Sequence, residues 1–149
     1  MPKSKTQEQA YDQCVADGMF LPQNTVELAR IKAMLVIAEE DVASITDLKV
    51  KGRWNTLYKL SYDVLHTLAE ALILHDKVKC ANHQCLFAYL CTKHPELELD
   101  WNFFERLRTR RNGIHYYGET ITAADYKASE VQLTLYIKTL HDALMAKTH

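Results

Sequence analysis

Glycine and proline are scarce in this chain, which holds four glycines and three prolines among its 149 residues. Both residues interrupt regular structure, so their scarcity argues against many short strands joined by turns and favours long helices. No segment alternates between polar and apolar residues for long enough to predict a strand. Internal repeats, low-complexity tracts and linkers are also missing, and this length is usual for one domain.

The sequence also lacks an excess of charge and a long apolar run. Its 18 Lys and Arg residues nearly balance its 19 Asp and Glu residues, so any concentration of positive charge is local. No apolar stretch approaches the about 20 residues that a membrane span requires, which predicts no membrane partner. The N-terminal sequence has no apolar core typical of a signal peptide. We therefore expect a cytoplasmic location, in which the four cysteines are reduced thiols.

Apolar residues recur at helical spacing in five segments, which predicts an all-α fold. The predicted helices cover residues 25–47, 55–77, 83–93, 101–118 and 123–144. Their suitable N-cap residues are Asn24, Asn82, Asp100 and Thr122. Residues 1–23 form an N-terminal extension in which a short helix would stop at Gly18. We predict one antiparallel bundle of four to five helices, spanning residues 1–149 as a single domain.

Four arginines crowd into six positions of the segment RLRTRRNGIHYYG, residues 106–118. On a helix, Arg106 and Arg110 share one face, whereas Arg108 and Arg111 share another. A solvated basic face is the commonest role of such a run. The abrupt change to His-Tyr-Tyr favours a site, because guanidinium groups bind phosphate bidentately, imidazoles exchange protons near neutral pH, and tyrosines stack on bases. Together these residue types suit RNA phosphodiester chemistry without a metal.

This segment resembles the HEPN superfamily of small α-helical bundles, whose signature is an arginine, four to six residues and then a histidine. YKLSYDVLHTLAEALIL and NHQCLFAYL resemble the second and third HEPN helices, and the resemblance covers roughly residues 25–146. Many HEPN proteins are metal-independent endoribonucleases in which two chains form one cleft. The resemblance therefore implies a toxin-like or defence endoribonuclease without a cofactor, an RNA or nucleotide ligand, and a homodimer. It also suggests a nucleotidyltransferase antitoxin as partner.

Carried over residue by residue, the HEPN motif assigns the catalytic roles to Arg110 and His115, with four residues between them. Arg110 would hold the scissile phosphate and His115 would transfer the proton. Arg108, with six residues before the histidine, also fits the motif as a phosphate-binding residue. Tyr117, two positions after the histidine, matches a tyrosine of some HEPN toxins and is a candidate for nucleotide modification.

A second register of the same motif implies a different function. Active members commonly carry a polar residue directly after the arginine, and in this chain Asn112 follows Arg111. Anchored there, the histidine position falls on Tyr116, as in a branch of HEPN-like small proteins with an Arg-Asn and Tyr-Tyr-Gly pattern. In this register His115 is not catalytic. Arg108, Arg111, Asn112 and Tyr116 would then bind a nucleotide, RNA or a nucleotidyltransferase without cutting.

Three thiols and two imidazoles within fifteen residues raise the question of zinc: Cys80, His83, Cys85, Cys91 and His94. Their spacing is not that of a standard zinc finger, and most of them fall on one helix with side chains facing different ways. We predict no metal site, and we expect Cys85 and Cys91 to be small core or half-exposed residues and His83 to start a helix beside its Asn82 cap.

The predicted helix of residues 55–77 carries two further pairs. Tyr62 and Asp63 are of interest because the matching helix face flanks the motif cleft in HEPN bundles, although packing is the default role. His66 has Glu70 one turn further on, and such pairs are common on helix surfaces.

Overall fold

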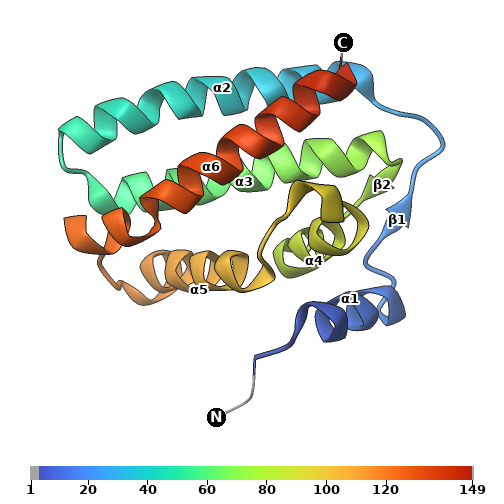
Figure 1. The fold of residues 1–149 in the computed structure, drawn as a ribbon, viewed down its shortest axis with the longest axis horizontal. Helices are drawn as coiled ribbons and strands as arrows, with labels where there is room; N and C mark the ends of the chain where they lie inside the picture. Colours follow the sequence, from blue (N-terminus) through green and yellow to red (C-terminus); the bar gives the residue numbers. More distant parts are fainter. Residues whose placement is uncertain (1–3, 149) are drawn as a thin grey trace.

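In a computed structural model, which describes residues 4–148, the chain forms six α-helices, one 3-10 helix and one pair of two-residue strands (Figure 1). The helices are α1 (Gln7–Ala16), α2 (Leu28–Val50), α3 (Trp54–His75), α4 (His83–Lys93), η1 (Pro95–Leu97), α5 (Trp101–Tyr117) and α6 (Ala123–Thr148). The strands β1 (Leu21–Pro22) and β2 (Val78–Lys79) pair antiparallel. The prediction of an all-α bundle is confirmed. Among these residues, no helix has both the length and the apolar character needed to cross a lipid bilayer.

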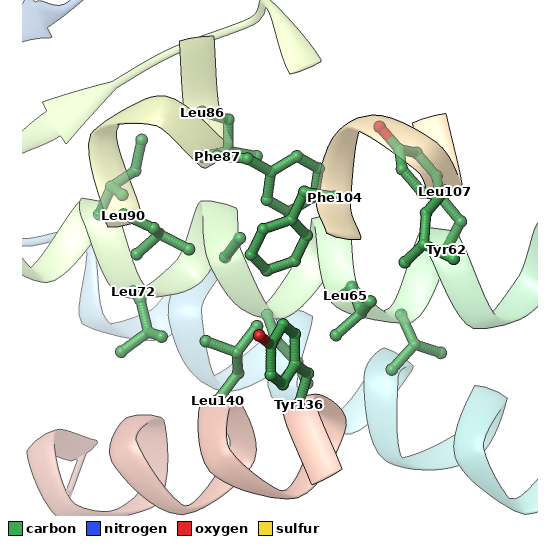
Figure 2. Packing of buried hydrophobic residues seen from close by; sticks show 14 of the residues in the cluster. Tyr62, Leu65, Leu72, Leu86, Phe87, Leu90, Phe104, Leu107, Tyr136 and Leu140 are labelled. Atoms are coloured by element: carbon green, nitrogen blue, oxygen red, sulfur yellow. The ribbon is translucent and has the colours of Figure 1, made fainter. Parts of the chain in front are cut away.

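Helix α3 is the centre of the bundle. Helices α2 and α6 pack against it and each other, and α4 and α5 likewise pack against it and each other. Most of its side chains are buried, and the partly exposed polar residues Asp63, His66 and Glu70 lie on one side of the helix. Above it, the rings of Phe87 in α4 and Phe104 in α5 stack with centroids 4.3 Å apart (Figure 2). Tyr136 of α6 approaches Phe104 at 5.4 Å, so aromatic contacts join the two pairs of helices.

Most helix ends lie where the cap residues predict them. The Asn82 side chain accepts a hydrogen bond from the Cys85 N–H at 3.0 Å, and Asp100 accepts one from Asn102 at 2.9 Å. The prediction that Asn24 caps α2 is wrong, because α2 begins at Leu28 without a side-chain cap. The segment before α2 instead continues the β1–β2 pairing, in which the Gln23 N–H donates to the Lys77 carbonyl at 2.8 Å.

Two of the four cysteines are paired. Cys14 of α1 and Cys85 of α4 form a disulfide, whereas Cys80 and Cys91 are free and buried. The prediction of four reduced thiols is therefore wrong for this pair. The two residues are 71 positions apart, and only the packing of α1 against α4 brings them together. This packing also makes the short N-terminal helix part of the fold.

Candidate functional site

The four arginines of α5 divide between two faces, as the helical spacing predicts. On one face, Nη2 of Arg110 lies 3.0 Å from Oδ2 of Asp125 in the first turn of α6. On the same side, the guanidinium of Arg106 lies 5.8 Å from the centre of the Phe103 ring. Arg108 and Arg111 lie on the other face, towards α3 and the start of α4.

A pocket of about 250 Å³ opens between the start of α4 and the last turns of α5. Its lining is polar and consists of Asn82, His83, Gln84, Arg108, Arg111, Asn112 and Tyr116. All four residues predicted to bind phosphate or RNA, Arg108, Arg111, Asn112 and Tyr116, are therefore brought together. The predicted catalytic residues Arg110 and His115 are not part of this lining.

The three aromatic residues at the end of α5 are accessible. The His115 ring is exposed and meets the Tyr116 ring edge-on, with centroids 4.6 Å apart. Tyr116 is 64% exposed at the rim of the pocket, and Tyr117 is 78% exposed. Most of the Tyr116 ring is thus open to a ligand, and Tyr117 is open to a modifying enzyme.

Arg111 is a mostly buried cation with poor partners. Its side chain is 16% exposed, and its nearest carboxylate oxygen, Oδ1 of Asp63, lies 3.8 Å from Nη2. The Asn112 side-chain oxygen lies 3.5 Å from Nη1, and Nε is buried without any hydrogen-bond partner among residues 4–148. Both distances exceed the about 2.7–3.2 Å of a normal N–H···O bond. Since burying a charge whose partners are this distant is costly, this arrangement favours a site that an anion completes.

Arg108 is better paired than Arg111. Its Nε donates to one carboxylate oxygen of Glu105 at 2.8 Å, and the other oxygen accepts from the Gln84 side chain. This network joins α5 to the first turn of α4. Because the pair uses only Nε, the two terminal amino groups of Arg108 remain available to a ligand.

Two histidines belong to this region, although the sequence did not assign either of them to the site. His83, the first residue of α4, lines the pocket, and its Nδ1 lies 3.3 Å from the Tyr62 hydroxyl oxygen. His66 of α3 packs against it, with the ring centroids 4.1 Å apart. The predicted pairing of His66 with Glu70 is present at 3.7 Å, but His66 is half-buried rather than on the surface. Tyr62 and His66 are i, i+4 neighbours, a spacing that could have drawn attention to this face.

Burial and the neighbouring arginines keep both histidines neutral. Burial lowers the pKa of His66 to about 4, with His83 and Arg111 acting in the same direction. Burial also lowers the pKa of His83, as does Arg111, while Asp63 opposes the shift. Burial raises the pKa of Tyr62, so its hydroxyl stays protonated. At neutral pH the pocket therefore combines two guanidinium groups with an uncharged imidazole.

The cysteine and histidine cluster does not form a joint site. Cys85 is bonded to Cys14, and the two nitrogens of His94 bond to Asp76 at 2.6 Å and Glu96 at 2.9 Å. Within the part of the chain that the structure describes, no group of three or more His, Cys, Asp or Glu residues is placed to hold a metal ion.

A larger cavity of about 1000 Å³ lies between α2 and α6. Its walls are mostly apolar and include Ile45 and Leu133, and the ion pair between Lys49 and Glu130 joins the two helices there. None of the predicted site residues lines it. The larger cavity therefore lacks the predicted site residues. We centre the site on the smaller pocket because two guanidinium groups and an imidazole line it.

No protein-family model, curated protein or solved structure matches this chain. The HEPN resemblance therefore stays a prediction that rests on the arginine-to-tyrosine segment and on the helical pattern.

Proposed function

We propose that this protein binds RNA by holding one of its phosphate groups in the pocket between α4 and α5, with Arg111 as the principal phosphate-binding residue. The observation that carries this proposal is the mostly buried guanidinium of Arg111, whose nearest acceptors lie 3.5 and 3.8 Å away. A phosphate oxygen that enters the pocket supplies the short, charge-assisted hydrogen bonds that the protein does not.

The other pocket residues suit the same ligand. Arg108 adds a second guanidinium, and the side-chain amides of Gln84 and Asn112 add neutral donors. The pocket lies at the N-terminus of α4, where unpaired backbone N–H groups and the helix dipole favour an anion. Tyr116 at the rim is exposed enough to stack on a base. Because these groups recognise phosphate rather than base edges, we expect little sequence preference.

The HEPN resemblance supports this ligand in the register that starts at Arg111. In that register Arg111, Asn112 and Tyr116 form the motif, and all three line the pocket. The phosphate can belong to an internal diester or to a 5′ end, and the experiment below separates these two sources.

The test is fluorescence anisotropy with short single-stranded oligoribonucleotides that carry either a 5′-phosphate or a 5′-hydroxyl. Arg111→Met should weaken binding about tenfold to a hundredfold, because a hydrogen bond to a charged group contributes about 1.5–3 kcal/mol. Arg106→Met is the matched control, since Arg106 lies on the other face of α5 against Phe103. Equal affinity for both RNAs indicates an internal phosphate, and preference for the 5′-phosphate indicates a terminal one.

The stability of Arg111→Met separates a binding role from a structural one. If Arg111 serves a ligand, removing its poorly paired charge should leave the free energy of unfolding of the RNA-free protein unchanged or higher. The salt dependence of binding should also fall, by about 0.7 in the slope of log K against log salt for one lost contact to a single strand. Unchanged RNA affinity together with a less stable variant would make Arg111 a structural residue and would refute the proposal.

The same oligonucleotides test RNA cleavage, the other function that the sequence predicts. His115 is exposed at the end of α5, so it is accessible to RNA or to a second chain. Metal-independent cleavage by Arg110 and His115 predicts cutting in the presence of EDTA, and His115→Ala should abolish it. RNA that is bound but stays intact favours the register in which Arg111, Asn112 and Tyr116 bind RNA without cutting it.

A further inference from the structure

His83 lies where three elements come together. It starts α4, faces the pocket beside Arg111 of α5, and meets Tyr62 and His66 of α3. Nothing in the motif assigns a role to this histidine, because it lies more than twenty positions before the first arginine of α5. Its position nevertheless places a titratable ring beside the guanidinium that is proposed to hold phosphate.

The charges around His83 explain why the ring is neutral without a ligand. Burial is the largest cause of the lowered pKa of His83, and the cations Arg111 and Arg108 of α5 also oppose a further positive charge. Asp63 of α3 acts in the opposite direction, and Glu105 of α5 is engaged by Arg108 and Gln84. A phosphate between the arginines and the imidazole adds negative charge at this point, so it favours the protonated ring.

Protonation of His83 reverses the direction of one hydrogen bond. In the neutral ring, the protonated Tyr62 hydroxyl can donate to Nδ1, so that Nε2 carries the ring proton. When the ring becomes an imidazolium, Nδ1–H donates to the Tyr62 oxygen instead, and Nε2 keeps its proton. His66 stays neutral, because its buried Nε2 has no partner among the described residues and its pKa is about 4. The pair of rings therefore takes up one proton and not two.

We propose that His83 is a phosphate-binding group of this pocket and takes up one proton from solution when a phosphate of RNA enters. The inference rests on the proposed function and deepens it, since it makes RNA binding stronger at lower pH. The phosphate then contacts cations from two elements, Arg111 of α5 and the imidazolium of α4.

The experiment measures the affinity for a 5′-hydroxyl oligouridylate between pH 6 and pH 8 at constant ionic strength. This probe has no group that titrates in that range, so changes in affinity belong to the protein. We expect binding to be about threefold to tenfold tighter at pH 6 than at pH 8, because one bound proton changes affinity by at most about tenfold per pH unit. His83→Gln keeps a side-chain donor but cannot titrate, and it should abolish most of this pH dependence.

His141→Gln is the matched control and should keep the wild-type pH dependence, because His141 lies on α6 and pairs with Glu39 of α2. If His83→Gln does not fold, calorimetry of the wild-type protein in two buffers of different ionisation enthalpy measures proton uptake directly. Uptake of a fraction of a proton per RNA bound at pH 7 supports the inference, and uptake of none overturns it.

The two proposals fail in different ways. Binding that depends on Arg111 but has the same pH dependence in wild type and His83→Gln overturns the role of His83 alone. Wild-type protein that binds no RNA at any pH, or binding that Arg111→Met leaves unchanged, overturns the proposed function itself.

Discussion

His66 keeps an unpartnered ring nitrogen inside the protein, next to His83 and within the field of Arg111. Its pKa falls from the ordinary 6.5 to about 4, mainly because the ring is buried. Between these values the unfolded chain binds a proton that the folded chain does not. The free energy of unfolding is therefore unaffected by His66 titration above pH 6.5, and it decreases progressively as the pH falls towards 4.

We expect His66→Gln to reduce the acid sensitivity of the fold, because glutamine does not titrate. The wild-type protein should lose on the order of 3 kcal/mol more than the variant between pH 7 and pH 4, since each unit of pKa shift corresponds to about 1.4 kcal/mol. Urea unfolding at several pH values measures this difference. His141→Gln should behave as wild type, and identical pH profiles for wild type and His66→Gln would contradict the assigned cause.

At the scale of residues, the sequence predicted which arginines share a face but not which face meets another helix. Arg111 lies seven positions after Phe104 and four after Leu107, and both of these are buried. This spacing places Arg111 on the continuation of the apolar stripe, so the stripe itself is a signal that Arg111 points inwards. That His83 and His66 meet it there depends on the packing of α3 and α4, which no local pattern encodes.

Helix α5 ends at Gly118, directly after the residues at the rim of the pocket. Gly118 has φ of 68°, in the left-handed region, and this conformation lets the Glu119 N–H donate to the Gly113 carbonyl at 3.1 Å. A side chain at this position meets nothing within 4 Å, so the effect of a substitution there is one of backbone conformation. The positioning of Tyr116 therefore depends on a glycine that does not itself contact the pocket.

Gly118→Ala should lower the free energy of unfolding by about 1 kcal/mol, because alanine is strained at positive φ. The last turn of α5 should fray, and RNA binding should weaken through Tyr116. Gly18→Ala is a close control, since Gly18 follows α1 with φ of 66° and equally open surroundings. Chemical denaturation and anisotropy should show similar stability losses in both variants but weaker binding only in Gly118→Ala. Equal losses of RNA binding in the two variants would show that the weaker binding does not come from fraying of α5.

At the scale of elements, local chemistry predicted the helices well and the short strands not at all. The side chains of Asn82 and Asp100 accept hydrogen bonds from N–H groups in the first turns of α4 and α5. Gly118 adopts the left-handed conformation that ends α5. The β1–β2 pair has two residues in each strand, which is too short for an alternating pattern to register. The chain continues this pairing through Gln23, and α2 begins at Leu28 rather than at the position that Asn24 predicts.

The disulfide between Cys14 and Cys85 constrains the whole molecule. Its partners are 71 positions apart, so in the unfolded chain it closes a long loop. Reduction should lower the free energy of unfolding by about 4 kcal/mol in the loop-entropy account. Urea unfolding with and without a phosphine reductant measures the effect. A Cys14→Ala, Cys85→Ala double variant should not respond to the reductant, and a response equal to that of wild type would show that the effect does not come from this disulfide.

At the scale of the molecule, the helical periodicity was sufficient to predict the bundle, because each apolar stripe requires a partner. The docking of α1 on α4 was not predictable, since it joins segments far apart in the chain. Disulfides persist mainly in oxidising compartments, so the cytoplasmic prediction and the Cys14–Cys85 bond point in opposite directions. The homodimer and the nucleotidyltransferase partner stay predictions, and sedimentation of the purified protein with and without RNA tests the former.

Because one sulfur–sulfur link ties α1 to the first turn of α4, helices α2 and α3 are enclosed in a covalent ring. A protease that cuts the backbone once between residues 14 and 85 therefore opens the ring but releases no fragment. The wall of the pocket that carries His83 would stay attached to both sides of such a nick for as long as the disulfide remains intact.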